Sequence, residues 1–279
     1  GRHAGGVIST GHENVAIGGN ALDALTTGND QVAVGYAALS ALTTGARCVA
    51  VGYAAGGNMT TGDDNTCIGY DAGVQITTGG SNVCVGTYAG DAITGGSSNT
   101  VVGRNALSLL TTNSYCTIMG SAAALNNTAS AITAIGTQAL YANTTGVENT
   151  AVGAYALDAN SGGNYNTVMG YHAATASNCN RTTAMGYRAA HAVTSGKENT
   201  ALGSEALYTA TTGTENCSVG YYSMYNTTTG SHNTAIGGNS AGSDNTTGSY
   251  NTFVGNISGD DSTTGNYNIA IGYNSGNVN

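Results

Sequence analysis

The chain has 279 residues and a net charge of −9 at pH 7, with 8% charged residues, 44 glycines, no proline and no tryptophan. Its six basic residues form no cluster, which argues against a nucleic-acid-binding surface. No apolar run approaches the length of a membrane-spanning helix, so we expect no membrane insertion.

Glycine recurs along the chain at a nearly constant spacing, and we call these residues the marker glycines. Of the 16 gaps between them, 13 are 17 residues, two are 16 and one is 18. A short period kept over a whole chain is typical of a solenoid, in which each repeat forms one rung. The marker glycines, which we take as structural residues, are Gly1, Gly18, Gly35, Gly52, Gly69, Gly86, Gly103, Gly120, Gly136, Gly153, Gly170, Gly186, Gly203, Gly220, Gly237, Gly255 and Gly272.

The repeat has no internal seam, so we expect one continuous segment over residues 1–279 with about 16 rungs. Gly1 already occupies a marker position, and the chain stops within a rung at Asn279. We therefore expect an excerpt of a longer repetitive protein.

The three residues before each marker glycine predict a short β-strand, such as Val32–Val34 or Thr150–Val152. The first is mostly Thr or Val, the second is mostly small, and the third is always aliphatic. This alternation indicates a strand with one buried face. We expect the third residue, which forms the preglycine column, to point into the core. The column is Ile17, Val34, Val51, Ile68, Val85, Val102, Met119, Ile135, Val152, Met169, Met185, Leu202, Val219, Ile236, Val254 and Ile271.

The small residue two places before the marker glycine forms the alanine column. We expect this column to pave an outer face on which only small side chains allow another chain to approach closely. Because the core of one rung is thin, burial within a single roll stabilises it poorly. We therefore favour a homotrimer or another bundle of parallel rolls, with a lone solenoid as the alternative. The predicted interchain stripe is Ala16, Ala33, Ala50, Ala151, Ala184, Ala201 and Ala235.

A second apolar segment follows each marker glycine. The third residue after the glycine is Ala in 13 rungs and Ser in the last four, and the fourth is often Leu, as at Leu39 and Leu157. We expect a second short strand on the opposite wall of the coil.

Thr-Thr-Gly sequences such as Thr43–Gly45 then predict an exposed turn that needs a left-handed glycine, with Asn113 and Asn180 replacing that glycine where it is missing. An asparagine four residues before many marker glycines predicts a ladder that satisfies the backbone at a turn. That asparagine column contains Asn14, Asn65, Asn82, Asn99, Asn149, Asn166, Asn199, Asn233 and Asn251.

The remaining polar residues suggest no catalytic or metal site. The five histidines fall in different columns, and we interpret the acidic pairs Asp63-Asp64 and Asp260-Asp261 as solvated turn residues rather than calcium ligands. The six cysteines predict small, unpaired core residues. We expect no cofactor and no enzymatic activity.

Tyrosines directly after the marker glycine, such as Tyr36, Tyr53 and Tyr70, predict packing between rungs, with stacking on sugars as the alternative. The two 16-residue repeats, which end at Gly136 and Gly186, are the candidate sites of a kink or a distinctive surface feature. N-glycosylation sequons, relevant only if the source organism glycosylates, occur at Asn58, Asn126, Asn143, Asn180, Asn216, Asn226, Asn245 and Asn256.

The repeat resembles two groups of fibrous proteins. The segments Asn149–Gly153, Asn199–Gly203 and Asn233–Gly237 combine an Asn-Thr-Ala-aliphatic-Gly strand with the Thr-Thr-Gly turn. They are similar to the left-handed β-roll heads of trimeric autotransporter adhesins. Their sequence is more similar to the repeats of bacteriophage tail fibres and large surface fibres. The resemblance covers the whole chain, although the period is longer than that of the adhesin repeat. It implies a left-handed, homotrimeric and extracellular structure.

These observations favour a structural fibre, either a rigid spacer or an attachment segment of a phage tail fibre or surface filament. Its partner would be the chain itself, as a homotrimer or filament. A head that binds cell-surface glycans is one alternative. An ice-binding solenoid is another, although its threonines would have to alternate along a flat face, and here they are adjacent in a turn.

Overall fold

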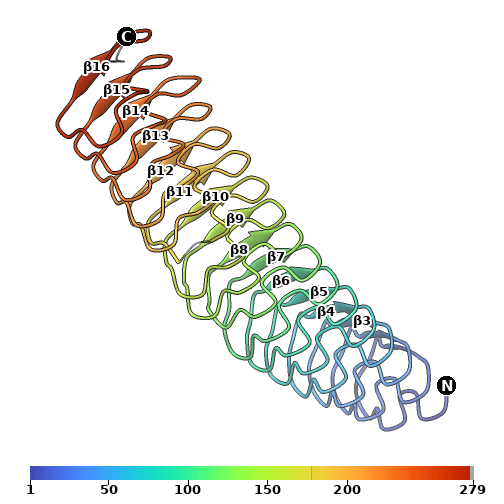
Figure 1. Ribbon diagram of the computed structural model, residues 1–279. Coiled ribbons are helices and arrows are strands. Elements are labelled where there is room, and N and C mark those ends of the chain that lie inside the picture. Colours follow the sequence, from blue (N-terminus) through green and yellow to red (C-terminus); the bar gives the residue numbers. More distant parts are fainter. Residues whose placement is uncertain (177, 277–279) are drawn as a thin grey trace. The chain divides into compact units, whose positions relative to one another are not determined.

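The computed structural model describes residues 1–176 and 178–276. It divides into two compact units, Gly1–Gln138 and Ala139–Asn279. Each unit is an all-β solenoid in which coils of about 17 residues stack on one another (Figure 1). Continuity of the repeat over residues 1–279 and its left-handedness stay predictions.

Each coil contributes one strand of three residues, and the described residues contain no helix. The predicted strands Val32–Val34 and Thr150–Val152 are confirmed. The first unit contains β1 (Val15–Ile17), β2 (Val32–Val34), β3 (Val49–Val51), β4 (Thr66–Ile68), β5 (Val83–Val85), β6 (Thr100–Val102), β7 (Thr117–Met119) and β8 (Thr133–Ile135). The second contains β9 (Thr150–Val152), β10 (Thr167–Met169), β11 (Thr183–Met185), β12 (Thr200–Leu202), β13 (Cys217–Val219), β14 (Thr234–Ile236), β15 (Thr252–Val254) and β16 (Ile269–Ile271).

Within each unit, successive strands pair in parallel and in register, so each sequence column becomes a ladder of side chains. Ala33 lies opposite Ala50, for example. The two 16-residue repeats keep this register, with Met119 opposite Ile135 and Met169 opposite Met185. The missing residue is therefore absorbed in a turn, and the strand ladder itself is not interrupted there.

The two faces of the strands are the reverse of our prediction. Residues of the alanine column point into the coil: Ala33, Ala50, Ala151, Ala184, Ala201 and Ala235 have no exposed surface, and Ala16 is half-buried. The preglycine column points outward, with Ile17 58% and Ile236 43% exposed. The predicted interchain stripe of alanines and the predicted burial of the preglycine column are both wrong.

The physical reason is the narrow interior of a 17-residue coil. Ala38 and Leu39 on the opposite wall are also fully buried, so the strand opposite them can direct only a small side chain inward. At Phe253, the largest inward residue, glycines make room for the side chain. Phe253 replaces alanine in this column, and a Cβ atom on Gly242 or Gly259 would overlap its ring.

The wall opposite the strands is a run of turns, so the predicted second strand is wrong. Alternate residues have left-handed backbone, such as Ala37 at φ 55° and Leu39 at φ 50°. The Ala37 N–H donates to Gly19 O of the preceding coil at 2.9 Å, and the Leu39 N–H donates to Ala55 O of the following coil at 3.0 Å. Backbone groups on this wall therefore find their partners in both neighbouring coils.

The Thr-Thr-Gly turn is held by its first threonine. The Thr43 hydroxyl and N–H both donate to the Thr60 carbonyl of the next coil, at 3.0 and 2.9 Å, and the same pair of bonds recurs from Thr60 to Thr77. Thr44 is exposed, as predicted.

The turn glycine is needed for a reason other than the predicted one. Gly45 is buried and does not have left-handed backbone, which falls instead on Arg47 at φ 55°. A Cβ atom at Gly45 would lie 2.5 Å from Gly62 O, so the constraint is close approach of the next coil. Asn113 occupies the equivalent position, but Asn180 does not, because there the Asn166 amide donates to Cys179 O at 2.9 Å.

The predicted asparagine ladder is confirmed. The buried Asn82 side chain donates to Gly96 O at 2.8 Å and to Asn65 Oδ1 at 3.1 Å. Its own Oδ1 accepts the N–H of Asn99 at 3.1 Å. One asparagine thus satisfies a turn carbonyl and links three coils through groups that water cannot reach.

We expect Asn82→Leu to lower the free energy of unfolding by about 3 kcal/mol, because it leaves the carbonyl of Gly96 and the N–H of Asn99 buried without partners. Chemical denaturation followed by circular dichroism measures the loss. Asn82→Gln is the matched control, since Gln31 stands in this column and its Oε1 accepts the Cys48 N–H at 3.0 Å. Equal losses from the two variants would show that side-chain size, rather than hydrogen bonding, controls this position.

Candidate functional surfaces

The marker glycines lie directly after the strands, where the chain leaves the sheet. Among the nine marker glycines named at the end of this paragraph, eight have φ between 130° and 139°, and Gly237 is the exception. A Cβ atom on any of the nine would overlap the backbone of the marker glycine one coil further on. They are structural residues that set the spacing of the coils. These nine glycines are Gly18, Gly35, Gly52, Gly69, Gly86, Gly103, Gly153, Gly203 and Gly237.

The outward face of the strands is the surface that our sequence analysis missed. It consists of the preglycine column together with the β-branched column, the first residue of each strand, which is Thr or Val except at Cys217 and Ile269. Val15 is 44%, Ile68 38% and Met119 43% exposed. None of the six basic and 15 acidic residues lies in a strand. The absence of charged residues from the strand positions is visible in the sequence. It is the signal that could have identified this uncharged outward face.

Charged side chains are confined to the turns and partly neutralise one another there. The Arg47 guanidinium lies 2.6 Å from Asp64 Oδ1, and its hydrogen bond lowers the pKa of the Asp64 carboxyl. Arg181 and Glu198 form the same contact between neighbouring coils at 2.7 Å. These exposed pairs add little stability, but they reduce repulsion along the turn columns.

Exposed aromatic side chains form ladders from coil to coil. The ring centroids of Tyr36 and Tyr53 are 5.4 Å apart, and those of Tyr53 and Tyr70 are 5.1 Å apart, with nearly parallel planes. In the second unit, Tyr208 stacks between His191 and Tyr225 at 4.9 Å from each. The predicted packing between coils of the tyrosines that follow the marker glycine is therefore confirmed for Tyr36, Tyr53 and Tyr70. The ladder through Tyr208 uses another column and was not predicted.

Five of the six cysteines are interior residues, as predicted, whereas Cys217 starts β13 and is only partly buried. Cys67 and Cys84 form no disulfide although they lie opposite each other in register. Burial raises the pKa of the Cys48 thiol to about 11. A buried thiol of raised pKa stays protonated at neutral pH and is a poor nucleophile.

Three of the eight predicted glycosylation sites are wrong. Asn143, Asn216 and Asn245 are buried, and their amides donate inside the coil, as Asn216 does to Gly230 O at 2.8 Å. The side-chain amide nitrogen of such a residue has no room for a glycan. Asn58 and Asn256 are exposed, Asn126, Asn180 and Asn226 are partly exposed, and glycosylation of these five stays a prediction.

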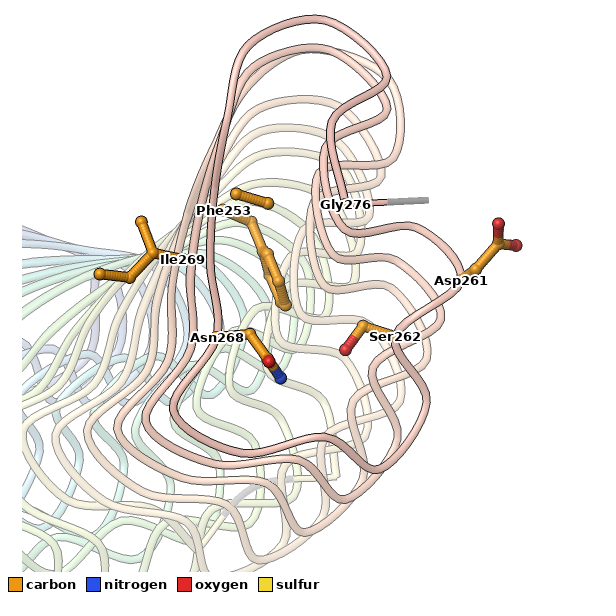
Figure 2. A pocket seen from close by; sticks show the side chains of 7 residues that line it. Phe253, Asp261, Ser262, Asn268, Ile269 and Gly276 are labelled. Carbon is orange, nitrogen blue, oxygen red and sulfur yellow. The ribbon is translucent and has the colours of Figure 1, made fainter. Parts of the chain in front are cut away.

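A hollow of about 260 Å³ lies at the last described coil. Figure 2 shows Phe253 directed into this coil and Ile269 directed out of it, which repeats the division into an inner and an outer strand face. The hollow belongs to the interior of this coil, where the buried Phe253 and Ala270 lie. Its lining is Phe253, Asp261, Ser262, Asn268, Ile269, Ala270 and Gly276.

Within residues 1–176 and 178–276, three or more His, Cys, Asp or Glu side chains never gather as they would around a metal ion. The same part of the chain has no helix of the length and apolarity needed to cross a bilayer. Comparison with models of known families and with curated proteins finds no match to this chain.

Proposed function

We propose that this chain is a structural segment of an extracellular fibre, such as a phage tail fibre or a cell-surface filament, and that it acts as a rigid spacer or attachment part. The observation that supports this best is the uniformity of the stack. Within each unit, successive coils are joined by the same parallel strand pairing, and many of them also by the same asparagine and threonine bonds. A molecule built in this way gains length with each repeat and uses its buried polar groups for stacking.

Two details favour this function over the alternatives. The Tyr53 ring has stacked neighbours on both sides, so its faces are not free for a sugar. The first threonine of the turn donates its hydroxyl to the next coil, so it does not offer a free array of hydroxyls to ice. In both cases the repeated side chains serve contacts between coils. We accordingly propose a non-enzymatic role, without a cofactor.

The test is to change the number of coils. Duplicating the three rungs from Tyr36 to Gly86 should lengthen the particle by about 14 Å, at about 4.8 Å for each coil. Electron microscopy of the parent and the extended chain measures the difference. A particle whose longest dimension does not increase would contradict a spacer function.

A further inference from the structure

The outward strand face combines exposure with an absence of charge. In the first unit the face carries the two columns that start and end β1 to β8, which are aliphatic or threonine throughout. Ile17, Val51 and Ile68 are 58%, 37% and 38% exposed. Isolated exposed apolar residues are ordinary, but contiguous ladders of them are characteristic of contact surfaces.

The size of the face suits a protein interface. The two columns over the eight coils of the first unit hold 16 side chains that are exposed or half-buried. A standard interface takes about 20–30 residues and on the order of 800 Å² from each partner, so this face is of comparable size. The second unit repeats the arrangement, with Met169 and Met185 39% and 41% exposed. Methionine adapts its shape to an opposing surface more readily than a β-branched residue.

The spacing of the face indicates its partner. In-register pairing places equivalent outward side chains about 4.8 Å apart along each unit. A surface that interdigitates with such a ladder over many coils must have the same spacing, and a second copy of this chain has it. The chain has a net charge of −9, yet no charged side chain lies in the strands, so two such faces can meet without like charges opposing each other.

We propose that the outward strand face is the seam through which copies of this chain associate. The inference rests on the proposed fibre function. It places the contact surface between copies on the outward strand face, because the alanine column lies inside the coil. The preglycine column, together with the β-branched column, packs against the same columns of neighbouring copies.

The test uses two lysines on the seam of the full chain. Ile68→Lys combined with Met119→Lys places charges at side chains that are 38% and 43% exposed, so the charges stay hydrated in the free chain and the coil is retained. The matched control, Thr44→Lys combined with Thr78→Lys, adds the same charge at exposed turn positions. Sedimentation equilibrium measures the mass, and circular dichroism measures the β content.

We expect the parent and the turn variant to sediment as oligomers, and the seam variant to fall to the mass of a single chain, 27.5 kDa, with unchanged β content. A seam variant that stays oligomeric overturns the proposal, as does a parent that is monomeric at all concentrations. A monomeric parent that shows thermal hysteresis would assign the face to ice, which also overturns it. The duplication experiment is independent, because a monomer that lengthens with added rungs leaves the fibre function in place.

Discussion

Replacing Gly69 by alanine should lower the free energy of unfolding by about 4 kcal/mol. Gly69 has φ +136°, a backbone conformation that costs an L-residue about 1–3 kcal/mol. Its new Cβ atom would also lie 2.6 Å from the carbonyl oxygen of Gly86 in the next coil. Overpacking against a backbone that is fixed by strand pairing adds a cost of about 1–3 kcal/mol. Urea denaturation followed by circular dichroism measures the sum.

Gly95→Ala is the matched control for this substitution. Gly95 is exposed and lacks left-handed backbone, and an added Cβ atom would meet only Thr78 Oγ1, at 3.8 Å. We expect no loss of stability at this site, or a small gain from the stiffer unfolded chain. Equal changes in the free energy of unfolding for Gly69→Ala and Gly95→Ala would show that the marker glycines do not set the spacing of the coils.

The repeat predicted the strands and their register because a fixed period places equivalent residues side by side. The strand Thr150–Val152 and the ladder through Asn65, Asn82 and Asn99 follow from this alone. The asparagines were identifiable because a polar residue at constant phase within an apolar stack needs a constant partner. Periodicity therefore determined which residues are neighbours.

Periodicity did not determine which face of the strand is inside. The alternation at Thr150, Ala151 and Val152 separates two faces but is symmetrical between them. We assigned the larger side chain to the core, as in an ordinary sheet, whereas a 17-residue coil has room for the smaller one. The large inward side chain of Phe253 faces Gly259, which has no side chain, and this pairing of a large with a small residue reflects the narrow interior of the coil.

The turn residues show a related limit. Gly45 and Gly69 both belong to recurring glycine columns, yet only Gly69 has left-handed backbone, and Gly45 is restricted by the carbonyl of Gly62. Sequence alone cannot separate these two causes, because both exclude a side chain. Left-handed residues such as Arg47 and Leu39 carried no signal of that conformation, since inter-coil hydrogen bonds rather than local preference hold them there.

The inversion of the strand faces predicts opposite outcomes for two adjacent substitutions. Ala151→Asp should abolish the cooperative fold of the second unit, or destabilise it by at least about 4 kcal/mol, because it encloses a carboxylate without a partner. Ala151 has no exposed surface, and Ala156 and Leu157 in the same coil are also fully buried. Val152→Asp should cost less than about 1 kcal/mol, since its side chain points outward and the charge remains hydrated.

Thermal and urea unfolding of both variants, followed by circular dichroism, distinguishes the two positions. The measurements belong at protein concentrations at which single chains predominate, so that loss of association at the outward face does not add to the effect of Val152→Asp. Ala151→Ser provides a small polar control, because Ser218 occupies the same column and donates its hydroxyl to Ser223 O at 2.7 Å. A larger loss from Val152→Asp than from Ala151→Asp would restore the aliphatic column to the core, and the outward seam would then have no residues to form it.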